Sequence, residues 1–136
     1  MLISLVICTC NRCSALRACL ERIERLESPS EWKLVVVDNG STDGTADLLR
    51  SFAERSALRV VLLVSEPKPG FGRARNASIV KATGQVIAFR DDDCYVSSDF
   101  LMKILDIFKG DRIGFMGGGD SLAWPHRYPH NDSARY

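Results

Sequence analysis

The sequence has no long hydrophobic run, no marked excess of either charge and no even set of cysteines. Its apolar stretches are of strand length and fall short of the roughly 20 residues that a membrane-spanning helix needs. The net charge of +1 gives no electrostatic reason to expect binding to nucleic acid. Residues 1–7 lack the basic start and small-residue cleavage site of a signal peptide. We therefore expect a cytoplasmic protein, with attachment to the inner face of the membrane left open.

The five cysteines do not form the paired pattern of a zinc or iron–sulfur site. Cys8 falls within the first apolar run, Cys10 and Cys13 follow that run, and Cys19 lies in the next helical stretch. An odd number without a signal peptide also argues against a disulfide framework. The thiols are therefore expected to be structural or incidental.

The order of apolar stretches predicts the fold class. The chain has 136 residues, of which 46% are hydrophobic and 26% charged, enough for one core but not for two. Strand-length apolar runs alternate with segments of helical spacing, which is typical of an α/β layered fold with a mostly parallel sheet. The expected strands are residues 2–9, 32–37, 58–64, 85–89 and 112–116, and the expected helices are residues 14–26, 45–55, 73–83 and 97–109.

Polar side chains follow three of these strands. Thr9 ends the first strand, Asp38 follows the second, and the triplet Asp91, Asp92 and Asp93 follows the fourth. In parallel α/β sheets, ligands bind at the carboxyl ends of the strands. The sequence therefore predicts a binding site at this edge of the sheet.

The acidic triplet carries most of the chemical information. Neighbouring like charges repel each other, so an ordered triplet needs a cation, and Arg90 directly before it is expected to offset part of the repulsion. Carboxylate oxygens suit hard ions such as Mg²⁺ or Mn²⁺, which also bind the phosphates of a substrate. In an extended segment, Asp91 and Asp93 would point the same way. Taken alone, the triplet is equally consistent with a solvated acidic turn.

Two common phosphate-binding loops are missing. The sequence contains no G-x-x-x-x-G-K-S/T loop. The first strand-to-helix turn, residues 9–12, has none of the glycines that let a dinucleotide pyrophosphate approach the backbone. The remaining possibility for a nucleotide site is a nucleotide that a metal ion bridges to the triplet.

Four segments together resemble the family 2 glycosyltransferases, which have the GT-A nucleotide-sugar fold. They are residues 6–12 (VICTCNR), 36–45 (VVDNGSTDGT), 72–76 (GRARN) and 89–93 (FRDDD). The resemblance implies a nucleotide-sugar-binding domain over residues 1–119. It also implies that residues 120–136 are a truncated or poorly ordered tail of the acceptor half.

The resemblance also implies roles for the matched residues. Thr9 and Asp38 would contact the base of the donor nucleotide, and Arg75 together with Arg73 would line the nucleotide pocket.

For the triplet, the resemblance implies a D-x-D pair. Asp91 would face the ribose or the metal, and Asp93 would be the main metal ligand. Asp92 would point elsewhere or reach the sugar. The metal, Mn²⁺ or Mg²⁺, would neutralise the diphosphate leaving group.

The expected reaction is transfer of a sugar from a UDP, GDP or dTDP donor to a saccharide or lipid-linked acceptor, with inversion at the anomeric carbon. It requires a general base. Family members continue for roughly another hundred residues that supply this base, so we expect an incomplete catalytic domain, and neither Asp120 nor Asp132 is assigned as the base. A non-catalytic nucleotide-binding module and a nucleotidyltransferase remain as alternatives, and a homo-oligomer is left open.

Overall fold

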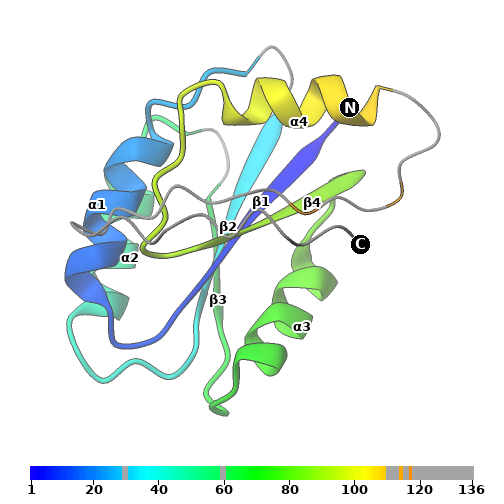
Figure 1. Cartoon of the computed structure of the whole chain (residues 1–136). Helices are drawn as coiled ribbons and strands as arrows, with labels where there is room; N and C mark the ends of the chain where they lie inside the picture. Colours follow the sequence, from blue (N-terminus) through cyan, green and yellow to red (C-terminus); the bar gives the residue numbers. More distant parts are fainter. Residues whose placement is uncertain (29–30, 59–60, 110–113, 115–116, 118–136) are drawn as a thin grey trace, which may run out of the picture.

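The computed structural model describes residues 1–28, 31–58, 61–109, 114 and 117. Within them, strands and helices alternate along the chain, as expected (Figure 1). In chain order the elements are β1 (Ile3–Thr9), α1 (Cys13–Ile23), β2 (Trp32–Asp38), α2 (Thr45–Arg55), β3 (Val61–Ser65), α3 (Phe71–Lys81), β4 (Val86–Asp91) and α4 (Phe100–Phe108).

The four strands form one parallel sheet in the order β3-β2-β1-β4. The register places Thr9 beside Asp38 and Cys8 beside Asp91. The carboxyl ends of β1, β2 and β4 therefore meet at one edge of the sheet. The predicted α/β class and the predicted gathering of polar residues at this edge are both confirmed.

Some element boundaries differ from the expected ones. Helix α1 ends at Ile23 instead of residue 26. After Ile23 the backbone changes to a tighter i to i+3 turn, in which the Arg25 N–H donates to the Arg22 carbonyl at 3.0 Å. Strand β4 extends to Asp91, so the first aspartate of the triplet belongs to the sheet. The expected strand at 112–116 and the tail at 120–136 lie outside the described residues, apart from position 114.

Helices cover both faces of the sheet (Figure 1). Alternate residues of β1, including Leu5 and Ile7, pack with the buried stripes of α1 and α2 on one face. Helix α4 joins the same side through Leu101, which packs against Ile3 and Val86. Helix α3 lies on the other face and buries Ala74. The central strands are thus buried on both faces, which explains their continuous apolar runs.

No helix in the described part of the chain combines the length and the apolar character needed to cross a bilayer.

Gly84, which precedes β4, allows the two backbones of β1 and β4 to approach closely. Its N–H donates to the Ser4 Oγ at 2.9 Å, and a Cβ at this position would lie 2.5 Å from the Ser4 nitrogen. We expect Gly84→Ala to lower the free energy of unfolding by about 1–3 kcal/mol, because backbone atoms must move. Urea denaturation measures this loss.

Gly72→Ala is the matched control. Gly72 lies in α3, where an added Cβ meets no atom within 4 Å, and alanine favours a helix over glycine. We expect its stability to be unchanged or slightly higher. Equal losses in the two variants would contradict the close packing at Gly84.

Candidate functional site

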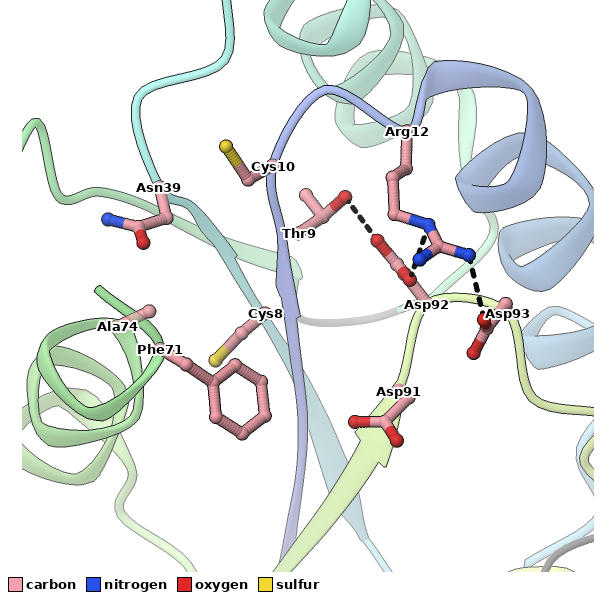
Figure 2. A pocket seen from close by; sticks show the side chains of 10 residues that line it. All are labelled: Cys8, Thr9, Cys10, Arg12, Asn39, Phe71, Ala74, Asp91, Asp92 and Asp93. Carbon is pink, nitrogen blue, oxygen red and sulfur yellow. Dashed lines mark hydrogen bonds and ion pairs between the residues drawn. The ribbon is translucent and has the colours of Figure 1, made fainter. Parts of the chain in front are cut away.

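A cavity of about 410 Å³ opens at the carboxyl edge of the sheet (Figure 2). Its walls come from the ends of β1 and β2, the first turns of α3 and the turn after β4. The lining residues are Cys8, Thr9, Cys10, Arg12, Asn39, Phe71, Ala74, Asp91, Asp92 and Asp93.

Asn11 joins the first two loops around the cavity. Its φ of 52° is left-handed, a region that asparagine enters more readily than most residues. The Asn11 Oδ1 accepts hydrogen bonds from the backbone N–H groups of Thr42 at 2.7 Å and Asp43 at 3.3 Å. In return, the Asn11 N–H donates to the Ser41 Oγ at 2.9 Å. Asn11 therefore fixes the β1–α1 turn against the β2–α2 loop through both its side chain and its backbone N–H.

Asn39 fixes the third loop, between β3 and α3. Its side chain is buried and donates through Nδ2 to the carbonyls of Glu66 and Lys68, both at 2.8 Å. Its Oδ1 accepts from the N–H of Gly70 at 3.0 Å. Gly70 has a φ of 138°, a conformation that favours glycine. This loop geometry brings Phe71 to the cavity wall.

The acidic triplet lies at a turn, so the expectation of an extended segment is wrong. Asp91 ends β4, and the N–H of Cys94 donates to the Asp91 carbonyl at 3.3 Å. The turn nevertheless brings Asp91 and Asp93 together. One ligand atom from each, with the Sγ of Cys94, lies within 4.8 Å of the others.

Asp92 points away from that pair and is nearly buried (Figure 2). Its Oδ2 accepts from the Thr9 Oγ at 2.7 Å, and its Oδ1 lies 3.3 Å from the Arg12 Nε. Burial raises the pKa of Asp92, and the hydrogen bond from Thr9 and the charge of Arg12 oppose that rise. Asp92 therefore ties the turn after β4 to the end of β1.

Arg12 supplies the positive charge that the sequence analysis assigned to Arg90. The Arg12 Nη2 lies 2.7 Å from the Asp93 Oδ2, in addition to the contact with Asp92. Arg90 instead donates to the Tyr95 carbonyl at 3.3 Å, and its guanidinium lies 4.9 Å from the centre of the Phe100 ring. Among the described contacts, Arg12 and not Arg90 is therefore the cation that pairs with Asp92 and Asp93.

The remaining predicted residues lie beside the cavity and do not line it. The Asp38 Oδ1 accepts from the N–H of Ser41 at 3.0 Å. Arg73 is in the first turn of α3, next to Gly70. The guanidinium of Arg75 lies 4.2 Å from the centre of the Phe71 ring. Thr9 and the triplet, in contrast, all line the cavity.

None of the five cysteines forms a disulfide, and their environments differ. Cys19 is a core residue, as expected of a structural thiol, and burial raises its pKa to about 12. Cys8 and Cys10 line the cavity, which the sequence analysis did not anticipate. Burial raises the pKa of Cys8, while Cys10 is exposed.

The donor atoms present suit a divalent cation. Two carboxylates converge beside the cavity, and carboxylate oxygens are ligands that Mg²⁺ and Mn²⁺ accept. The three aspartates carry three negative charges, of which the paired Arg12 guanidinium balances one. The three aspartates of the turn thus outnumber the one guanidinium that pairs with Asp92 and Asp93, which favours a cation there.

Comparison with known proteins gives a family match. The model of a family described as "Glycosyl transferase family 2" matches residues 4–125. The glycosyltransferase AglE of Haloferax volcanii is 28% identical over 125 residues, covering 91% of this chain and 41% of AglE. The poly(ribitol-phosphate) beta-glucosyltransferase of Bacillus spizizenii is 32% identical over 104 residues, covering 76% of this chain and 16% of that protein. The chain thus spans less than half the length of these relatives.

A solved structure shares the fold. The mannosyltransferase PcManGT from Pyrobaculum calidifontis, in complex with GDP-Man and Mn²⁺, superimposes with a TM-score of 0.77 at 27% identity. The likeness covers 82% of this chain and 33% of the mannosyltransferase. The expected GT-A architecture is confirmed.

The Thr9–Asp92 hydrogen bond can be tested through stability. We expect Thr9→Val to lower the free energy of unfolding by about 1–3 kcal/mol at neutral pH, because a buried carboxylate loses a donor. Since the pKa of Asp92 is raised in the fold, ionisation of Asp92 costs stability above that pKa. The loss should therefore shrink as the pH falls through this raised pKa and the carboxyl becomes neutral. Urea denaturation across the acid range measures it.

Thr83→Val is the control for this substitution. The Thr83 hydroxyl also takes part in a side-chain hydrogen bond, which it accepts from the Lys33 Nζ at 2.8 Å, but on the exposed surface. We expect little loss and no pH dependence of that loss. A pH-independent loss in Thr9→Val would show that the Asp92 charge is not involved.

Proposed function

This chain belongs to glycosyl transferase family 2, and from that premise we propose that its cavity binds the diphosphate of a nucleotide-sugar donor through a divalent cation. The observation that carries the proposal is the convergence of Asp91 and Asp93 beside a cavity at the carboxyl end of a parallel sheet. The solved mannosyltransferase of the same fold, which holds GDP-Man and Mn²⁺, supports it.

Asp91 and Asp93 would hold the cation, Mn²⁺ or Mg²⁺, which neutralises the leaving diphosphate when bound. Asp92 has a different task, because Thr9 and Arg12 already occupy both of its oxygens. It fixes the turn, so the two outer carboxylates face the cavity before any ligand arrives. Such preorganisation lowers the cost of assembling the site.

The base of the nucleotide would lie toward β2 and α3. Asp38 has one oxygen engaged with the N–H of Ser41, and its other oxygen would accept a hydrogen bond from a ring N–H of the base. Thr9 would contribute to the adjacent wall of the base pocket. Phe71 is 54% exposed although it lines the cavity, so its ring offers an apolar surface to the base.

Arg73 and Arg75 would place positive charge beside the nucleotide, at the beginning of α3. Arg75 also lies against Phe71 and would hold that ring in place.

The complete reaction would transfer the sugar to a hydroxyl of a saccharide or lipid-linked acceptor, with inversion. This step needs a general base. We assign none among the described residues, since Asp120 and Asp132 lie outside them. The cavity would accordingly bind the donor, and the acceptor groove is proposed to belong to the rest of the enzyme.

Metal-dependent nucleotide binding is the first test. We expect UDP, GDP or dTDP to raise the melting temperature of the wild-type chain only with Mn²⁺ present. A ligand at a hundred times its dissociation constant stabilises a protein by about 2.7 kcal/mol. The shift should disappear in Asp93→Asn, because the cation loses a charged ligand. Differential scanning fluorimetry measures it.

Asp106→Asn is the matched control, since Asp106 is an exposed carboxylate of α4 paired with Lys109. It should retain the full shift. A Mn²⁺-dependent shift that survives in Asp93→Asn would remove Asp93 as a metal ligand. A shift with ATP alone would favour a nucleotidyltransferase, and binding without turnover in the complete enzyme would favour a non-catalytic module.

Alkylation of Cys10 gives an independent test of where the nucleotide binds. Cys10 is exposed in the cavity wall, whereas Cys13 does not line the cavity. We expect nucleotide diphosphate with Mn²⁺ to slow the reaction of Cys10 with iodoacetamide severalfold and to leave Cys13 unaffected. Peptide mapping by mass spectrometry follows both thiols in one sample. Equal rates with and without ligand at Cys10 would place the nucleotide elsewhere.

A further inference from the structure

The guanidinium of Arg12 makes two contacts of different character at the aspartate turn (Figure 2). Its Nε lies 3.3 Å from the Oδ1 of Asp92, whose side chain is only 7% exposed. Its Nη2 lies 2.7 Å from the Oδ2 of Asp93, whose side chain is 41% exposed. The first contact is anchored, because Asp92 is also held by Thr9. The second is a half-exposed ion pair, a type that contributes little net stability and is easily exchanged.

Asp93 lies between Arg12 and the position proposed for the cation. Its Oδ2 faces Arg12, while its Oδ1 lies 4.0 Å from the Sγ of Cys94. Cys94 belongs with Asp91 and Asp93 to the cluster whose ligand atoms converge. In Figure 2, Arg12 approaches the turn from one side and Asp91 lies on the other. The Asp93 carboxylate is therefore shared between the Arg12 guanidinium, which is part of the protein, and the proposed site of a cation that binds and leaves.

We propose that Arg12 is a resident counter-ion of the aspartate turn that competes with the divalent cation for Asp93 and so sets the metal affinity of the site. The proposal rests on the function proposed above. Without metal, Arg12 balances one of the three aspartate charges and holds Asp93 beside Asp92. When the cation binds, the Arg12–Asp93 contact weakens and the Arg12–Asp92 contact remains. Arg12 is thus a positioning residue that lowers metal affinity while keeping the metal-free site formed.

Electrostatics gives the expected size of the effect. A unit charge and a divalent ion a few ångströms apart repel each other substantially even when solvent screens them. Arg12 is about half exposed, with 49% of its side chain accessible, so the screened value applies. Removing the positive charge should therefore tighten Mn²⁺ binding by roughly tenfold. The difference should decrease at high ionic strength.

The test compares Mn²⁺ binding by wild type, Arg12→Gln, Arg12→Lys and Arg50→Gln, measured by the EPR signal of free Mn²⁺ without nucleotide. Glutamine keeps a hydrogen-bond donor but removes the charge, and lysine keeps the charge. Arg50→Gln makes the same change in net charge at an exposed ion pair of α2, with Asp47. We expect roughly tenfold tighter binding in Arg12→Gln only, with Arg12→Lys and Arg50→Gln within about twofold of wild type.

Thermal unfolding provides a second readout that needs no activity. Arg12→Gln should melt below wild type without metal, because buried Asp92 loses its charged partner, and saturating Mn²⁺ should raise its melting temperature by more than that of wild type. A merely structural role would lower stability without tightening Mn²⁺ binding.

The outcomes separate this inference from the proposed function. Unchanged or weaker Mn²⁺ binding in Arg12→Gln, with wild type binding and Asp93→Asn not binding, overturns the competition but leaves the metal site intact. Tighter binding in Arg50→Gln as well would attribute the effect to net charge and also overturn it. No Mn²⁺ binding by wild type would overturn both proposals. If Arg12→Gln does not fold, Arg12→Lys provides the test. Lysine keeps the positive charge, so tighter Mn²⁺ binding by Arg12→Lys than by wild type would contradict competition by that charge.

Discussion

The site depends on one buried carboxylate. Asp92 is nearly inaccessible, and both of its oxygens are engaged, one by the Thr9 hydroxyl and one by the Arg12 guanidinium. A buried charge is tolerable only with such partners, so the Asp92 side chain has to lie beside Thr9 and Arg12. The turn after β4 is fixed to the end of β1 as a result. The directions of Asp91 and Asp93 follow from that attachment.

The loops on the other side of the cavity are fixed by asparagine amides. Asn11 joins the β1–α1 turn to the β2–α2 loop, and Asn39 joins β2 to the β3–α3 loop. The Asn39 amide donates and accepts at once, and the Asn11 amide accepts twice, so each side chain satisfies backbone groups of a neighbouring loop that helices and strands leave unpaired. Loops of a parallel sheet would otherwise be free to move apart. Here they form a stable rim on which Phe71 stays exposed to the cavity.

Sequence reasoning identified the residues of the site better than it identified their interactions. It placed Thr9 and the triplet at one edge, because parallel strands put their carboxyl ends together, and the structure agrees. It did not find Arg12 as the partner of Asp92, nor Asn11 and Asn39 as loop ties. The only signal available was that these polar residues directly follow strands. It also assigned the counter-charge to Arg90, the nearest cation in the sequence, whereas Arg12 pairs with Asp92 and Asp93 and Arg90 donates to the Tyr95 carbonyl.

Periodicity and local turn chemistry act over a few residues, so the alternation of strands and helices, the parallel sheet and the set of polar groups at its edge are predictable from the sequence alone. Which of those groups pair depends on the three-dimensional packing of distant segments. Thr9 and Asp92 are separated by 83 positions, and Arg12 and Asp93 by 81. Contacts over such separations depend on register and on the direction of each side chain at the strand end. Three successive aspartates are alike in the sequence, so no local pattern encodes which of them is buried.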